Sequence, residues 1–181
     1  PKGSSMNSST EAENNGQSAC RLTYDFELLR HSSLFSGLHL DVVKLFAYLS
    51  NRRSYRLGDV LIEQGSQADR AFIINEGSID ITITHKEREV VLQKLSKGDF
   101  FGELALLAQF DWFFTARAAT DLQALVIERS SFQKILEKYP DYKDQLIERI
   151  VQVRVDRLID QTNFMLDNLA LSDNDHAAGI I

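Results

Sequence analysis

Residues 98–118, GDFFGELALLAQFDWFFTARA, decide the fold and raise the functional question. Gly102 precedes a segment, 103–107, that can form a short helix. The free N–H groups at the start of such a helix attract an anion, and a glycine lets a ligand approach the backbone closely. Where a cation would complete the site, the chain has an acidic and aromatic run instead: Phe110, Asp111, Trp112, Phe113 and Phe114. The stretch therefore begins as an anion-binding loop and lacks the expected positive charge.

The residues before this stretch have the pattern of short β-strands. Ile79, Ile81 and Ile83 alternate with polar residues, as in a strand with one buried face. The polar segment 84–89 then predicts a turn into a second strand at 90–92, and a further strand is predicted at 122–127. Glycines separate the apolar runs, at Gly58, Gly65, Gly77 and Gly98. This pattern predicts a mainly β fold, a double-stranded β-helix (jelly-roll) barrel.

Helical patterns flank the predicted barrel. Apolar residues at helical spacing over 28–49, interrupted at Ser36 and Gly37, predict two N-terminal helices. A further helix, capped by Ser130 or Ser131, leads to Pro140. We expect four regions: a flexible tail over 1–20, the barrel with its flanking helices over 21–140, a long C-terminal helix over 141–171, and a tail over 172–181. Residues 1–5, before Met6, are expected to be a cloning remnant.

The predicted C-terminal helix carries an apolar stripe. Its members are spaced alternately by four and three residues, as in a heptad seam: Val151, Val155, Leu158, Thr162, Met165 and Leu169. Two interpretations stay open. The stripe can form a coiled-coil contact in a homodimer, or it can lie on the surface of its own domain.

Composition limits the class of protein. The 181 residues are 44% hydrophobic and 25% charged, which is ordinary for a soluble domain, and no apolar run reaches the ~18 residues of a membrane span. The net charge of -6 opposes a nucleic-acid surface, since the densest basic cluster is Arg52, Arg53 and Arg56. The single cysteine, Cys20, excludes an internal disulfide, and no secretory segment is evident. We expect a cytoplasmic protein that contacts neither nucleic acid nor membrane.

Catalytic patterns are missing. The four histidines are scattered through the chain, at His31, His39, His85 and His176, so a metal site is not predicted. Neither a nucleophile elbow nor a Walker-type phosphate loop is present. We therefore predict no catalytic residues, no metal and no cofactor. A cupin-like metalloenzyme, which shares the jelly-roll fold, is the alternative from another class.

Three segments together resemble the cyclic-nucleotide-binding domain family. They are GDVLIEQGSQADRAFIINEGSIDI (58–81), GDFFGELALL (98–107) and TARAATDLQALVIERSSFQKILEKYP (115–140). The resemblance covers about residues 28–158. Over this range the sequence is similar to the regulatory subunits of cyclic-AMP-dependent kinase and to the catabolite activator protein. It implies a non-enzymatic regulatory and sensor domain whose ligand is cAMP or cGMP and whose signal passes to an effector protein. Relatives that act as transcription factors carry a DNA-binding domain after the long helix, and here only about ten residues follow Leu171.

The resemblance also assigns the cassette residues, Gly102, Glu103, Leu104 and Ala105. Glu103 would accept the ribose 2′-hydroxyl. An arginine that pairs with the cyclic phosphate is expected six residues before Ala118, and that position is Trp112. Losing such a charge-assisted hydrogen bond costs roughly 1.5–3 kcal/mol. The resemblance therefore implies weak or lost cyclic-nucleotide binding, all the more so if Asp111 faces inward.

Arg117 offers an alternative cation. A working cAMP or cGMP sensor could use Arg117 together with backbone donors. However, Ala116 and Ala118 are the smaller residues and fit the inside of a tight barrel, so the alternation of a strand predicts that Arg117 points outward.

The aromatic run allows three interpretations. Phe110, Trp112, Phe113 and Phe114 can fold into the empty pocket and plug it, since aromatic side chains gain much from burial. They can stay exposed as an anchor for a partner protein. Alternatively, Trp112 can stack on a purine or on another flat small molecule. The residues alone leave these three open.

Overall fold

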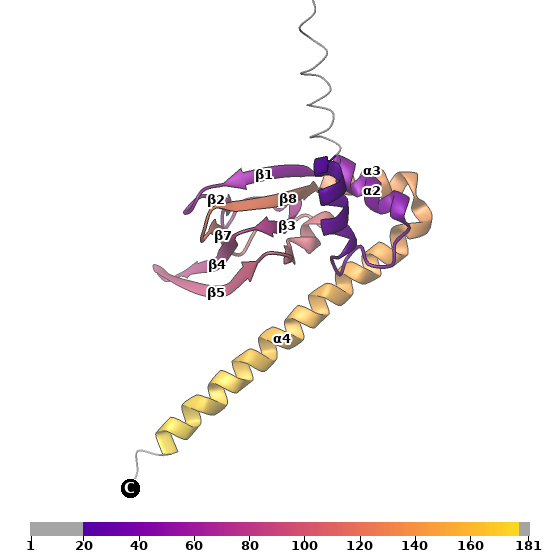
Figure 1. The fold of residues 1–181 in the computed structure, drawn as a ribbon. Helices are drawn as coiled ribbons and strands as arrows, with labels where there is room; N and C mark the ends of the chain where they lie inside the picture. The colour runs from indigo at the N-terminus through magenta and orange to yellow at the C-terminus, as the bar shows by residue number, and fades with distance from the viewer. Residues whose placement is uncertain (1–19, 178–181) are drawn as a thin grey trace, which may run out of the picture.

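A computed structural model describes residues 20–177; of Phe164 and residues 167–177 it describes only the backbone. Within the described residues, eight antiparallel strands form two four-stranded sheets that face each other (Figure 1). The first sheet has the order β1 (Asn51–Tyr55), β8 (Leu122–Glu128), β3 (Arg70–Glu76) and β6 (Phe100–Phe101). The second has the order β2 (Val60–Ile62), β7 (Thr115–Ala118), β4 (Ser78–His85) and β5 (Arg88–Ser96). The predicted jelly-roll fold is confirmed.

The β4–β5 hairpin shows how the residue pattern sets the register. Ile79 and Ile81 are buried, as the alternation predicted, but the register shifts between Ile81 and Thr82, so that Thr82 is buried and Ile83 is only half-buried. The strands run on to the pair His85 and Arg88. The two residues between them, Lys86 and Glu87, have φ values of 48° and 64°. A two-residue loop with positive φ at both positions matches the right-handed twist of the strands. The predicted turn at 84–89 is thus shorter, and the predicted strand at 90–92 is the middle of β5.

The first sheet separates two apolar cores. On β3, Ala71 and Ile73 point to the helices, while Phe72 and Ile74 point into the barrel. The helix-side core includes residues of α2 (Leu40–Leu49), α3 (Arg129–Lys138) and the start of α4 (Lys143–Ala177). The 3₁₀ segment η1 (Glu103–Leu106) joins both cores, because Leu106 packs with the helices and Ala105 with the barrel interior. The cassette is therefore anchored on two sides.

Helix boundaries differ from the prediction. The first helix covers residues 20–30 and therefore starts well before Leu28, so that Cys20, expected in a tail, is its exposed first residue. The predicted serine cap of α3 is wrong, because α3 begins at Arg129 without a side-chain cap. The Arg129 N–H instead donates to the Asp69 carbonyl at 2.8 Å, so a neighbouring loop satisfies this donor.

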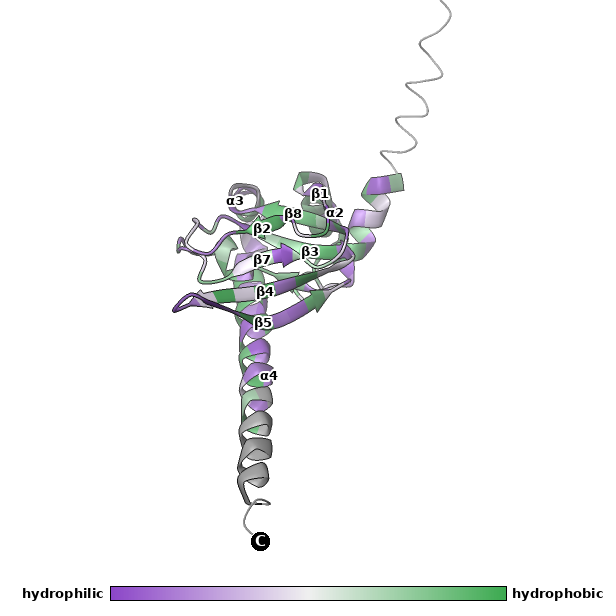
Figure 2. Cartoon of the chain, turned by 90° about the vertical axis from the view of Figure 1, so that its left-hand side faces the viewer, coloured by the Kyte–Doolittle hydropathy of each residue, from purple (hydrophilic) through white to green (hydrophobic). Residues whose placement is uncertain are grey.

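The last helix is longer than predicted. After a 3₁₀ turn, η2 (Pro140–Tyr142), α4 continues to Ala177, so most of the tail predicted at 172–181 is helical. Residues 1–19 of the tail predicted at 1–20, which include the expected cloning remnant, and residues 178–181 lie outside the described residues. Figures 1 and 2 show α4 crossing beside the barrel and projecting away from it. No helix in the described range combines the length and apolarity that a membrane span needs.

The apolar stripe of α4 does not lie against its own domain. The side of α4 that faces the barrel carries the buried Leu146 and Ile150 and then the half-buried Arg157 and Gln161. The stripe is turned from this side by about 100°, the step of one helical residue. Its described apolar members are 42–64% exposed: Val151, Val155, Leu158 and Met165. Thr162 is exposed as well, and the side chain of Leu169 lies outside the described residues.

Candidate ligand-binding cassette

Gly102 fixes the start of the cassette. It lies between β6 and η1 with φ of 81°, a left-handed conformation that favours glycine. A Cβ added here would lie 3.0 Å from the Arg70 carbonyl oxygen and 3.1 Å from Cη2 of Trp112. The predicted helix 103–107 is a shorter 3₁₀ turn, from which Leu104 is exposed and Ala105 is buried. The glycine is therefore required by close packing on both sides, and one of these neighbours is the indole.

Trp112 fills the barrel interior beside Gly102. Its side chain is only 4% exposed and belongs to the barrel-side core. Two half-buried rings flank it, with centroid distances of 5.3 Å to Phe110 and 5.1 Å to Phe114. The backbone N–H of Trp112 donates to the Ser66 carbonyl at 2.8 Å, and the backbone carbonyl of Trp112 accepts from the Gly65 N–H at 2.7 Å. Backbone and side chain thus hold the indole inside the barrel.

Phe113 faces the opposite way. It is 54% exposed and meets the half-buried Phe114 edge-on, at 5.0 Å between ring centroids. Asp111 is exposed too, so its charge does not point into the barrel. The aromatic run therefore divides by strand-like alternation into a buried tryptophan and an exposed phenylalanine.

Arg117 lies outside the barrel, as the alternation of β7 predicted. Ala116 and Ala118 are buried, and Arg117 between them is exposed. Its Nη1 donates to the Gly58 carbonyl at 3.0 Å. The guanidinium therefore braces an outer turn and does not point at Gly102.

Glu103 is buried and bound to the C-terminal helix. Its side chain is 4% exposed, and Arg157 of α4 approaches its two carboxylate oxygens with Nη1 at 3.1 Å and 3.4 Å. No local pattern predicts this pairing, because Glu103 and Arg157 lie 54 positions apart in the sequence. The carboxylate that the family resemblance assigned to a ribose thus already has a cationic partner.

Arg129, which no sequence pattern predicted as part of the site, ties the cassette to the barrel. Its guanidinium donates to the carbonyls of Ala68 and Ala105 and to that of Ala108 at 2.6 Å. Ala105 belongs to η1 and Ala108 to the loop that follows. One side chain at the start of α3 therefore joins the second half of η1 and the loop after it to the segment before β3.

Comparison with known proteins places this cassette in a family. The model of the cyclic nucleotide-binding domain matches residues 52–139. The solved structure of a cyclic nucleotide-binding-like protein from Brucella abortus is 32% identical, with a TM-score of 0.58, and the match covers 62% of this chain and 97% of that one. The chain belongs to the cyclic nucleotide-binding domain family.

Curated relatives carry this domain within longer chains. A cGMP-dependent protein kinase of Drosophila melanogaster is 31% identical over 123 residues, which are 65% of this chain and 13% of the kinase. A cAMP-dependent protein kinase regulatory subunit of Debaryomyces hansenii is 30% identical over 116 residues, which are 64% of this chain and 25% of the subunit. This cyclic nucleotide-binding domain thus spans a quarter or less of the length of these two curated relatives.

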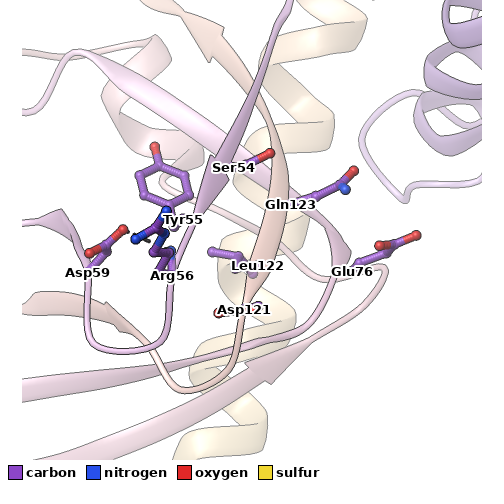
Figure 3. Close-up of a pocket in the computed structure, with 8 residues that line it drawn as sticks. All are labelled: Ser54, Tyr55, Arg56, Asp59, Glu76, Asp121, Leu122 and Gln123. Carbon is purple, nitrogen blue, oxygen red and sulfur yellow. Dashed lines mark hydrogen bonds between the residues drawn. The ribbon is translucent and has the colours of Figure 1, made fainter.

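An open cleft of about 410 Å³ lies elsewhere on this cyclic nucleotide-binding domain, at the ends of β1 and β8 (Figure 3). Two of its carboxylates already accept backbone N–H groups, Asp59 from Arg56 at 2.8 Å and Asp121 from Leu57 at 3.1 Å. Tyr55 packs against the barrel-side core, and burial raises the pKa of its hydroxyl. These polar groups stabilise the cleft's own turns. Within the described residues, no cluster of three His, Cys, Asp or Glu side chains could hold a metal ion.

Proposed function

We propose that this chain is a non-enzymatic regulatory domain of the cyclic nucleotide-binding family in which binding of cAMP and cGMP is weak or lost. The observation that carries the proposal is the position of Trp112, which stands where the family resemblance calls for an arginine and is buried against Gly102. A cyclic phosphate at the start of η1 would have to displace the indole.

The energetic cost of that displacement is large. A tryptophan buries about 150–250 Å², so exposing it costs roughly 4–6 kcal/mol at ~25 cal/mol per Å². The missing charge-assisted hydrogen bond adds roughly 1.5–3 kcal/mol. Because each 1.4 kcal/mol or so changes affinity tenfold, binding should be weaker by about ten-thousandfold or more than in a site with the arginine. Arg117 does not offset this loss, since it faces outward.

Isothermal titration with cAMP and cGMP at low salt tests the proposal. The parent protein should give no binding heat, and a Trp112→Arg variant should gain affinity for at least one nucleotide. Phe113→Arg is the matched control, because it adds the same charge at an exposed neighbouring position. Micromolar binding by the parent would overturn the proposal and favour the alternative, a working cAMP or cGMP sensor. Loss of that binding in Arg117→Ala would identify Arg117 as the cation that pairs with the phosphate.

We propose further that the domain forms a homodimer through the exposed stripe of α4. Four described apolar members of this stripe face solvent in the single chain, and the heptad spacing suits a second copy of the same helix. Light scattering should give a dimer for the parent and a monomer for Leu158→Asp. Asn163→Asp adds the same charge about 140° away around the helix and should leave the dimer intact. A monomeric parent would remove this claim.

An effector protein is the second proposed partner. The cassette exposes Leu104 and Phe113 on its outer side, and an exposed phenylalanine suits the centre of a protein contact. In this role the cassette would present a surface and would not enclose a nucleotide.

A further inference from the structure

We infer that Arg157 and Glu103 form an internal latch that fastens α4 to the cassette without a ligand. The inference deepens the proposed function and rests on it, since it assigns Glu103 to the chain's own helix and not to a nucleotide. The latch is a contact between the cassette, at η1, and the C-terminal helix α4.

The burial of Glu103 makes this pair more than a surface contact. Its side chain is 4% exposed and that of Arg157 is 22% exposed. A buried carboxylate without a partner is costly, because it has lost its hydration. Arg157 is the ion-pair partner found for Glu103 in the described part of the chain. The position of the arginine is therefore tied to that of the carboxylate.

Packing alone does not fasten this part of α4. Leu146 and Ile150 are completely buried in the helix-side core, but no described residue of α4 beyond Ile150 is buried. The next contact after Arg157, from the Gln161 amide to the Gln93 side chain of β5, is long at 3.5 Å. The ion pair is thus the strongest identified contact between the barrel and the described part of α4 beyond Ile150.

The ion pair couples the cassette to α4. Arg157 Nη1 lies 3.1 Å and 3.4 Å from the two Glu103 carboxylate oxygens, so a ligand group that displaced the guanidinium would loosen α4. By linkage, loosening α4 would favour binding of such a ligand by the same factor. In the latched state described here, the helix is fixed without any ligand.

Hydrogen exchange on the ligand-free protein tests the latch. In Arg157→Met, amides of α4 over 154–163 should exchange about ten- to a hundredfold faster, which corresponds to the loss of a hydrogen bond between charged groups. Amides of β3 and β8 report on the barrel. Arg154→Met is the matched control, because Arg154 lies one turn earlier on the same helix, is also half-buried, and has no ion pair among the described residues. It should leave α4 exchange within about threefold of the parent.

A double variant, Glu103→Gln with Arg157→Met, distinguishes two effects of losing Arg157. One is the loss of the contact that holds α4, and the other is the cost of leaving the buried Glu103 carboxylate without a partner. If Arg157→Met also weakens the barrel, the double variant should restore protection in β3 and β8 while α4 stays fast. The latch is overturned by unchanged α4 exchange in Arg157→Met, by an equal effect in Arg154→Met, or by full recovery of α4 protection in the double variant. None of these measurements uses a nucleotide, so failure of the latch and failure of the proposed loss of nucleotide binding are distinguishable.

Discussion

Replacing Trp112 with alanine should destabilise the domain strongly. The indole is 4% exposed and packs between Phe110 and Phe114 beside Gly102. Burial of such a side chain is worth roughly 4–6 kcal/mol as transferred area, and measured tryptophan-to-alanine losses in cores are about 3–5 kcal/mol. Because the two flanking rings are half-buried and can relax into the space, we expect about 3 kcal/mol.

Urea unfolding followed by circular dichroism measures this loss. Phe113→Ala is the control: it removes an exposed ring from the neighbouring position and should cost under about 1 kcal/mol. A dry apolar cavity binds small apolar molecules, so indole or benzene should raise the melting temperature of Trp112→Ala and not that of the parent. A Trp112→Ala loss no larger than that of Phe113→Ala would refute the assignment of Trp112 to the core.

Three other features give further expectations. Arg129→Met should lower the free energy of unfolding by about 2–4 kcal/mol, because it strands backbone carbonyls of the cassette, and a loss within experimental error would contradict the role given to this side chain. The hydrogen bond from Arg70 lowers the pKa of Asp69 below its ordinary value of 3.8. The stabilisation from this bond is therefore present above the ordinary pKa and disappears as the pH falls through the lower folded value. The stability advantage over Asp69→Asn should therefore be constant near neutral pH and shrink below about pH 4; an advantage independent of pH would exclude the carboxylate as its source. Changing Lys86 and Glu87 to Asn and Gly should stabilise the β4–β5 hairpin by about 0.5–1 kcal/mol in thermal unfolding, since both positions have positive φ, and a lower melting temperature would argue against that turn.

Short-range patterns predicted most of the fold. The alternation of Ile79 and Ile81 identified β4, and the small residues Ala116 and Ala118 correctly oriented β7 with Arg117 outside. Both predictions use only the two-residue alternation of side chains along one strand, which the local sequence contains. The serine cap of α3 failed for the complementary reason, because the donor at that helix start is satisfied by a carbonyl, that of Asp69, far away in the sequence.

The site was less predictable than the fold. The resemblance located the substitution at Trp112, but residue types alone could not decide whether the ring is buried or exposed. That choice depends on the space beside Gly102 and on backbone hydrogen bonds from the loop at Gly65. The pairing of Glu103 with Arg157 joins two distant segments and leaves no local signal.

The fluorescence of Trp112 tests the central claim most directly, since it is the only tryptophan in the chain. Emission and acrylamide quenching would be measured on the parent protein with increasing cAMP, and separately with cGMP. A tryptophan that fills the pocket predicts blue-shifted emission and weak quenching, with neither changed by saturating nucleotide. Emission typical of a solvent-exposed indole, or a saturable change on adding either nucleotide, would contradict the account.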